Sequence, residues 1–166
     1  MKMKFYLLPV LAFIIFTATS CPEEDGDVYL VNIEVVNLDN SGEDAYISEE
    51  PVNRNAFVIG VNYLVGYTPN EKKPFSFNKK FSYDNIVILN FPDNPTIICN
   101  EDFDEDHPAN SDVTKFFKIS THNDRDYDML LLLMEPPVTG TYSFRVVFNC
   151  PNNVVIKKET EPVTLF

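Results

Sequence analysis

Apolar and polar residues alternate along most of the chain from Val28 to Phe166, and this period of two predicts strands rather than helices. The segments "VYLVNIEVV" from Val28 and "NAFVIGVNYLVGY" from Asn55 are rich in β-branched and aromatic residues, which favour strands. Polar segments with turn residues separate the predicted strands. Shorter strands are predicted at 75–77, 85–91, 96–99 and 113–120.

The last third of the chain carries the clearest pattern. The run "DMLLLLM" at 128–134 fits a helix or a strand by periodicity, but its length and the prolines at 136–137 favour a strand buried on both faces. The segments "GTYSFRVVFNC" and "NVVIKKETEPVTLF" flank "PNN", which predicts a hairpin. Alternation places four apolar residues on one face of its first strand: Tyr142, Phe144, Val146 and Phe148.

Eight or nine short strands separated by turns indicate an all-β fold, an antiparallel immunoglobulin-like β-sandwich of about 7–9 strands. Tyr142 follows a turn and opens a long strand, which resembles the E–F corner of immunoglobulin-like domains. Its hydroxyl either bonds back to the preceding loop or meets water. The chain has no Trp, so the resemblance is to the broad sandwich architecture and not to antibody domains.

The first twenty residues have the character of a secretory signal peptide. Lys2 and Lys4 precede the apolar run "FYLLPVLAFIIF", and small residues follow at 17–20. The run is shorter than the ~20 residues of a membrane-spanning helix. We therefore expect a cleaved signal peptide at 1–20, a tether at 21–27 and a single domain at 28–166.

Cys21 follows the small residues directly, which resembles the lipobox of bacterial lipoproteins. Ser20 fits that pattern, whereas Ala18 stands where leucine is usual. The resemblance implies cleavage before Cys21 and a diacylglycerol on its sulfur, so that the membrane becomes a partner through the N-terminal lipid. The alternative is an ordinary secretory signal that happens to end beside a cysteine.

Acidic residues fill the segment after Cys21, "PEEDGD". They form a solvated tether, or they act as a sorting signal, since acids in this place resemble the export signal of surface lipoproteins in the Bacteroidetes. As a whole the chain resembles the small lipoproteins of Bacteroides, whose families carry no assigned activity. The resemblance implies an outer-membrane lipoprotein of the cell envelope, on the periplasmic or the extracellular face.

The charge balance excludes one class of partner. The chain has 13 Lys and Arg against 25 Asp and Glu, a net charge of −12, and loss of the two leader lysines makes it −14. Nucleic-acid binding needs a basic surface, so we expect no nucleic-acid partner. Lipidation of Cys21 would leave Cys99 and Cys150, and export predicts a disulfide between them. The alternative is a pair of buried free thiols.

Two acidic runs have a spacing that can bind a hard cation. Carboxylates at alternate positions can converge on Ca²⁺, which takes six to eight oxygen ligands. Neither run has the glycine or the final glutamate of an EF-hand loop, and acidic proteins usually place such charges in solvated loops. The sequence predicts a weak calcium site at best, and no other cofactor, with these candidate ligands: Asp102, Asp104, Asp106, Asp124, Asp126 and Asp128.

Catalysis has little support. No serine lies in a nucleophile-elbow motif, no glycine-rich phosphate loop is present, and His107 and His122 lack the spacing of a zinc site. We therefore predict no enzyme but a non-enzymatic binding or interaction module for a protein or a glycan. One alternative is carbohydrate capture on Tyr67 and Tyr127 for a polysaccharide-uptake system. Another is a structural subunit of a surface fibre or envelope complex, paired through the edge of the 153–166 strand.

Overall fold

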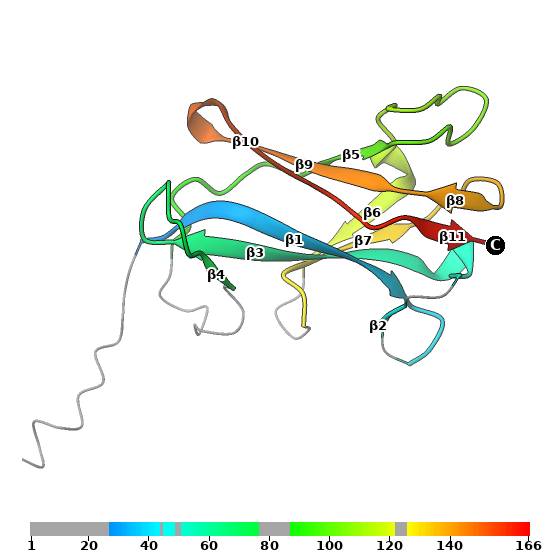
Figure 1. The fold of residues 1–166 in the computed structure, drawn as a ribbon, viewed down its shortest axis with the longest axis horizontal. Coiled ribbons are helices and arrows are strands. Elements are labelled where there is room, and N and C mark those ends of the chain that lie inside the picture. Colours follow the sequence, from blue (N-terminus) through cyan, green and yellow to red (C-terminus); the bar gives the residue numbers. More distant parts are fainter. Residues whose placement is uncertain (1–26, 44, 49–50, 77–86, 122–125) are drawn as a thin grey trace, which may run out of the picture.

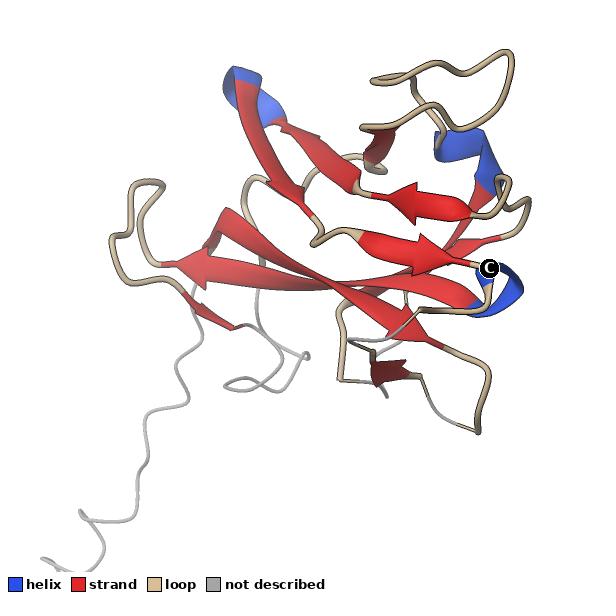
Figure 2. Cartoon of the chain, turned by 45° about the vertical axis from the view of Figure 1, so that its right-hand side comes forward, coloured by secondary structure: helices blue, strands red, loops and turns tan. Residues whose placement is uncertain are grey.

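The computed structural model describes residues 27–43, 45–48, 51–76, 87–121 and 126–166. The predicted signal peptide, Cys21 and all of the tether except Asp27 lie outside this range. Strands account for 51% of the described residues, α-helices are absent from them, and the named strands pair antiparallel. The predicted all-β antiparallel sandwich is confirmed, and Figure 2 shows its two layers.

The first layer is a six-stranded sheet in the order β2-β1-β3-β7-β6, with β4 also paired to β3 (Figure 1). Its long central strands are β1 (Tyr29–Asp39) and β3 (Phe57–Gly66), which pair along their whole length. The remaining members are β2 (Tyr46–Ile47), β4 (Phe75–Ser76), β6 (Phe117–Ser120) and β7 (Met129–Leu133). The ambiguous run at 128–134 is therefore a strand, as its length indicated.

The second layer is built on one long hairpin and β5 (Thr96–Cys99). Its first arm is β8 (Gly140–Tyr142) and β9 (Phe144–Cys150), and its second arm is β10 (Val154–Glu159) and β11 (Val163–Leu165). The short 3₁₀ turn Pro151–Asn153 joins the arms. Asn152 and Asn153 have φ angles of 63° and 59° there, a left-handed backbone that asparagine tolerates well. The predicted hairpin is confirmed.

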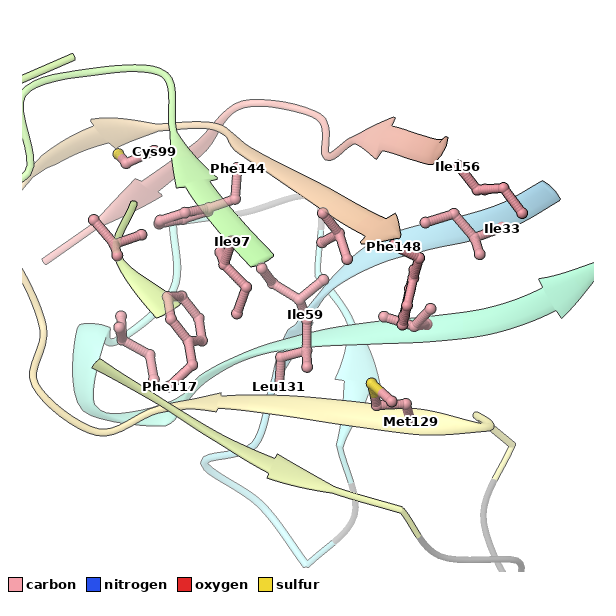
Figure 3. Close-up of a cluster of buried hydrophobic side chains, with 14 of the residues drawn as sticks. Ile33, Ile59, Ile97, Cys99, Phe117, Met129, Leu131, Phe144, Phe148 and Ile156 are labelled. Carbon is pink, nitrogen blue, oxygen red and sulfur yellow. The ribbon is translucent and has the colours of Figure 1, made fainter. Parts of the chain in front are cut away.

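The main core fills the space between the layers, as Figure 3 shows. Alternate residues of β3 and β9 point inward, and the four apolar residues predicted for one face of the β8–β9 arm are all buried. Rings join the layers: the centroids of Phe57 and Phe144 are 5.5 Å apart, and those of Tyr63 and Phe148 are 5.9 Å apart. Ile33 of β1 and Ile156 of β10 face each other at one side of this core.

Two predicted strands differ from the structure. Of the segment 85–91, the described residues 87–91 form no strand but a turn with one bridge, between Ile88 and Val28. The Asn90 side chain takes the place of a backbone partner, because its amide accepts from Leu30 N at 2.7 Å and donates to Leu30 O at 2.9 Å. The segment 113–120 begins with the 3₁₀ turn Thr114–Phe116, so its strand is shorter than predicted.

The Tyr142 hydroxyl bonds back to the preceding loop. The ring is buried, and its hydroxyl donates to the Val138 carbonyl at 2.8 Å. This confirms the first of the two interpretations of Tyr142 and ties the loop before β8 to the core. The corner is a feature that immunoglobulin-like domains share, while the immunoglobulin-like class itself stays a prediction.

Tyr142→Phe is expected to lower the free energy of unfolding by about 1 kcal/mol, the net contribution of one such hydrogen bond. The ring stays in place, so the change isolates the hydroxyl. Urea unfolding measures it, and Tyr46→Phe is the matched control because the Tyr46 side chain is exposed. Equal stability of the two variants would contradict a structural role for the corner.

Candidate functional site

One edge of β1 is covered only at its two ends. Near the start, Val28 bonds to Val87 O and Leu89 N, and Asn90 covers Leu30. At the far end Leu38 and Asp39 pair with β2. Between these covers, residues 31–37 form no ladder with another strand on this edge within the described part of the chain, and β10 of the second layer lies beside them. Unpaired backbone of this kind is a template for another extended segment.

The second layer has a matching edge beside it. β10 pairs only with β9 among the described strands, whereas β11 is covered on its outer side by Val52. Val52 N donates to Thr164 O at 2.9 Å, and Phe166 N donates to Val52 O at 3.2 Å. The edge strand predicted over 153–166 is therefore open only in its first half. Lys157 and Lys158 are exposed there, and such lysines oppose unspecific pairing.

Two hollows lie along these edges and meet at Glu161 and Pro162. We call them together the edge groove. The larger, of about 770 Å³, is lined by Ser143, Arg145, Lys157, Lys158, Glu159, Thr160, Glu161 and Pro162. The smaller, of about 450 Å³, is lined by Val35, Val36, Asn37, Ile47, Ser48, Pro51, Glu161, Pro162, Val163 and Thr164. The groove is thus charged at one end and largely apolar at the other.

Asn37 connects the two layers at the apolar end. Its side chain is 8% exposed, and its amide donates to the Glu161 carbonyl at 2.7 Å. Its side-chain oxygen is buried and has no hydrogen-bond partner in the structure. A buried acceptor without a partner costs about 1–3 kcal/mol, which offsets part of the stability that the bond to Glu161 contributes.

Arg145 is held firmly at the charged end. Its guanidinium donates to Glu159 Oε1 at 2.8 Å and to Asn100 Oδ1 at 3.0 Å. With Lys157 and Lys158 it places three positive side chains on one groove of a chain whose net charge is −12. The charged end therefore has a local potential that differs from that of the molecule as a whole.

Sequence reasoning missed both Asn37 and Arg145. A signal for Asn37 was present, because alternation from Ile33 and Val35 puts this polar residue on the inward face of a strand. Arg145 gave no such signal, since charged residues are ordinary on the outer face of a strand.

The structure describes five of the six candidate calcium ligands and does not bring these five together. The segment with Asp102, Asp104 and Asp106 precedes β6, whereas Asp126 and Asp128 follow β6 and lead into β7, so the two runs lie at opposite ends of β6. Asp124 lies outside the described residues. Within the described ranges no group of three or more His, Cys, Asp or Glu side chains is placed to hold a metal ion. The described residues therefore give no support to a calcium site shared by the two runs, and the weak calcium site stays a prediction.

The carboxylates of the first run serve the loop itself. Asp104 accepts from the backbone N–H groups of Asp106 and His107, at 2.9 and 2.8 Å, and Asp102 accepts from Ala109 N at 2.7 Å. The hydrogen bond with the His107 side chain lowers the pKa of Asp104. The alternating acids are thus turn-forming residues, which is a common role for aspartate.

Tyr67 and Tyr127 do not form one platform for a sugar. Tyr67 follows the end of β3 and lies against Phe75, with ring centroids 5.4 Å apart. Tyr127 packs on the outer face of the first layer over Gly60, in a small second core with Leu38, Val58 and Leu130. Tyr127 lies over Gly60, and Tyr67 directly follows Gly66 in the chain. Gly60 and Gly66 are six residues apart on the extended strand β3, a distance of about 20 Å.

The predicted Cys99–Cys150 disulfide is wrong for this structure, in which both cysteines are free and buried. Cys99 pairs with Phe144, and Cys150 lies at the other end of the same strand, six residues from Phe144. That spacing is about 20 Å along a strand. A disulfide needs Cα atoms within about 7 Å, so the two side chains cannot be bridged.

Both thiols are expected to react with iodoacetamide in urea without reductant, and neither in native buffer. Burial raises the pKa of the Cys99 thiol from 9.0 to about 11 and also raises that of Cys150. The folded state therefore favours the protonated thiol, and stability falls as the pH rises from 9 to about 11. Intact mass measures the labelling. If the thiols react in urea only after a reductant is added, the two cysteines form a disulfide after all.

No helix within the described ranges has the length and apolar character needed to cross a membrane. Comparison with known proteins found no matching family model, no matching curated protein and no matching solved structure.

Proposed function

We propose that this chain is a lipid-anchored protein of the cell envelope that acts as a non-enzymatic interaction module. The leader with Cys21 supports the anchor, and the resemblance to Bacteroides lipoproteins supports the outer membrane. The absence of nucleophile and phosphate-binding motifs from the sequence supports a binding role. Its ligand on this proposal is an extended segment of a partner protein.

The edge groove carries this proposal. It lies beside the uncovered stretch of β1 and the open edge of β10, and an added strand satisfies such backbone groups while side-chain pockets set specificity. Asn37 lines the apolar end of this groove and holds the two layers together there through its hydrogen bond to the Glu161 carbonyl. Carbohydrate capture has less support, because Tyr67 and Tyr127 stand apart and Tyr127 is engaged in packing.

Site-specific photocrosslinking in cells tests the proposal. We would place p-benzoylphenylalanine at Ile47 or Lys157, one at each end of the edge groove, and at Val138 as the control. Ile47 and Val138 are 62% and 69% exposed, so exposure does not separate them. Adducts are expected from the two groove positions and not from Val138, and fragments of the partner should map to one short segment. No adduct at the groove, or equal adducts at Val138, would reject the proposal.

Protease shaving of intact cells tests the membrane face. The native chain is compared with a variant in which Glu23, Glu24, Asp25 and Asp27 are neutralised. If the acidic segment is an export signal, the native domain is lost and the variant is protected. Protection of both, in cells whose known surface proteins are cleaved, would make the segment a tether and the role periplasmic.

A further inference from the structure

The described chain begins at one end of the sandwich, and three segments gather there. Tyr29 pairs with Gly66, so the β3–β4 loop lies at this end, and Val28 bridges Ile88 in the 87–91 segment. The Tyr63 ring contacts Phe91 and Phe148 edge-on, at 5.8 and 5.9 Å, which brings the start of β10 alongside. Figure 1 shows the β3–β4 loop and the β9–β10 turn at this end, opposite the C-terminus. We call it the anchor end.

Exposed apolar side chains concentrate at the anchor end. Among the described residues eleven large hydrophobic side chains are exposed, and six of them belong to this end: Tyr67, Val87, Leu89, Phe91, Val154 and Val155. Val87, Leu89 and Phe91 are 58%, 46% and 53% exposed on one five-residue segment. Single exposed hydrophobics need no explanation, but a group of them marks an interaction surface.

The charges of this end suit a lipid headgroup layer. Lys72 and Lys73 are exposed in the β3–β4 loop beside Tyr67. Lysines and aromatic rings around an aliphatic centre are the residues that settle at a membrane interface. Asp27, Glu71 and Asp93 also belong to this end, so the apolar side chains and not net charge must supply most of the attraction.

The proposed lipid anchor at Cys21 would place the apolar surface of the anchor end close to the membrane. Asp27 lies six positions after Cys21, a span of at most about 20 Å of chain. A lipidated Cys21 therefore keeps the anchor end within that distance of the bilayer. At such an effective concentration even weak contacts are occupied.

We propose that the anchor end seats directly on the bilayer, with Val87, Leu89 and Phe91 in the headgroup region. This inference rests on the proposed lipid anchor. Seating of this kind directs the C-terminal end of the sandwich away from the membrane and leaves the edge groove open at the side.

The chain has no Trp, so one introduced Trp is a unique reporter. We would reconstitute the mature lipidated chain in vesicles of phosphatidylethanolamine and phosphatidylglycerol with brominated acyl chains. Phe91→Trp should show a blue-shifted emission and strong quenching by the bromolipid. Val138→Trp, which is at the opposite end, should show neither. Adding Val87→Asp and Leu89→Asp to the Phe91→Trp chain should abolish the quenching while the protein still floats with the vesicles.

The outcomes separate the two proposals. Flotation without quenching of the Phe91→Trp chain, or equal quenching at both reporters, would reject the seating and leave the anchor intact. Failure to float, together with an intact mass that lacks the lipid, would reject the anchor and with it the seating. Unfolding curves of each variant establish that the domain is folded. Lys72→Glu with Lys73→Glu, added to the Phe91→Trp chain alone, should weaken its quenching in the anionic vesicles.

Discussion

Phe144→Ala is expected to lower the free energy of unfolding by about 3–5 kcal/mol, the usual cost of removing a buried ring. Phe144 is fully buried at the start of β9. Its ring centroid lies 5.5 Å from those of both Phe57 and Phe117, so it contacts the first layer at two strands. Alanine would leave a cavity between the layers that this rigid strand cannot close.

Denaturant unfolding of the variant measures this loss. Phe166→Ala is the matched control, because the same ring is removed where it is 57% exposed, and it should change stability by less than about 1 kcal/mol. Losses of similar size in the two variants would mean that Phe144 does not join the layers as described.

Gly60→Ala is expected to destabilise the domain by about 1–3 kcal/mol, as overpacking does. A methyl group at this position would lie 2.7 Å from Tyr127 Cδ1 and 2.9 Å from Leu38 Cδ1. In an open strand the same change would instead stabilise by about 0.5–1 kcal/mol, because glycine loses more backbone entropy on folding. The sign of the effect therefore reports whether the Tyr127 and Leu38 side chains cover Gly60.

A double-mutant cycle separates this packing role of Tyr127 from ligand binding. In a Tyr127→Ala background the contacts with the ring are gone and only that with Leu38 Cδ1 remains, so Gly60→Ala should cost less than in the native chain. The same cost in both backgrounds would place Tyr127 away from Gly60. With that result, the Tyr127 side chain would again be a candidate for ligand binding.

Local pattern predicted much of the fold because a strand buried on one face has a period of two. The alternation of "YSFRVVF" correctly predicted Tyr142, Phe144, Val146 and Phe148 on the core side. The segment 87–91 has the same composition but lacks a strand, since the Asn90 side chain, not its backbone, pairs with Leu30. The replacement of a backbone partner by the Asn90 side chain depends on Leu30, sixty positions away in the chain. The local sequence pattern therefore cannot predict it.

The candidate site was harder to predict for the same reason. Whether Cys99 meets Cys150 depends on the lateral register of β5 on β9, and two sequence positions contain no information on register. The edge groove depends on which edges remain uncovered after the layers pack. The sequence predicted an open edge over the whole of 153–166, but Val52 covers β11, so only the β10 half with Lys157 and Lys158 is open.

The hydrogen bond from Asn37 to Glu161 joins residues 124 positions apart, and Val52 bonds to Thr164 over nearly the same distance. A fold closed by such distant contacts forms slowly, since a long loop must be ordered before its contacts stabilise it. A chain that leaves the ribosome from its N-terminus has all strands of the first layer once β7 has followed, but the second layer cannot form until β8 to β11 have followed as well. Until then the core face of β1 and β3 lacks its covering layer, and the incomplete chain is in a state that suits the export proposed above.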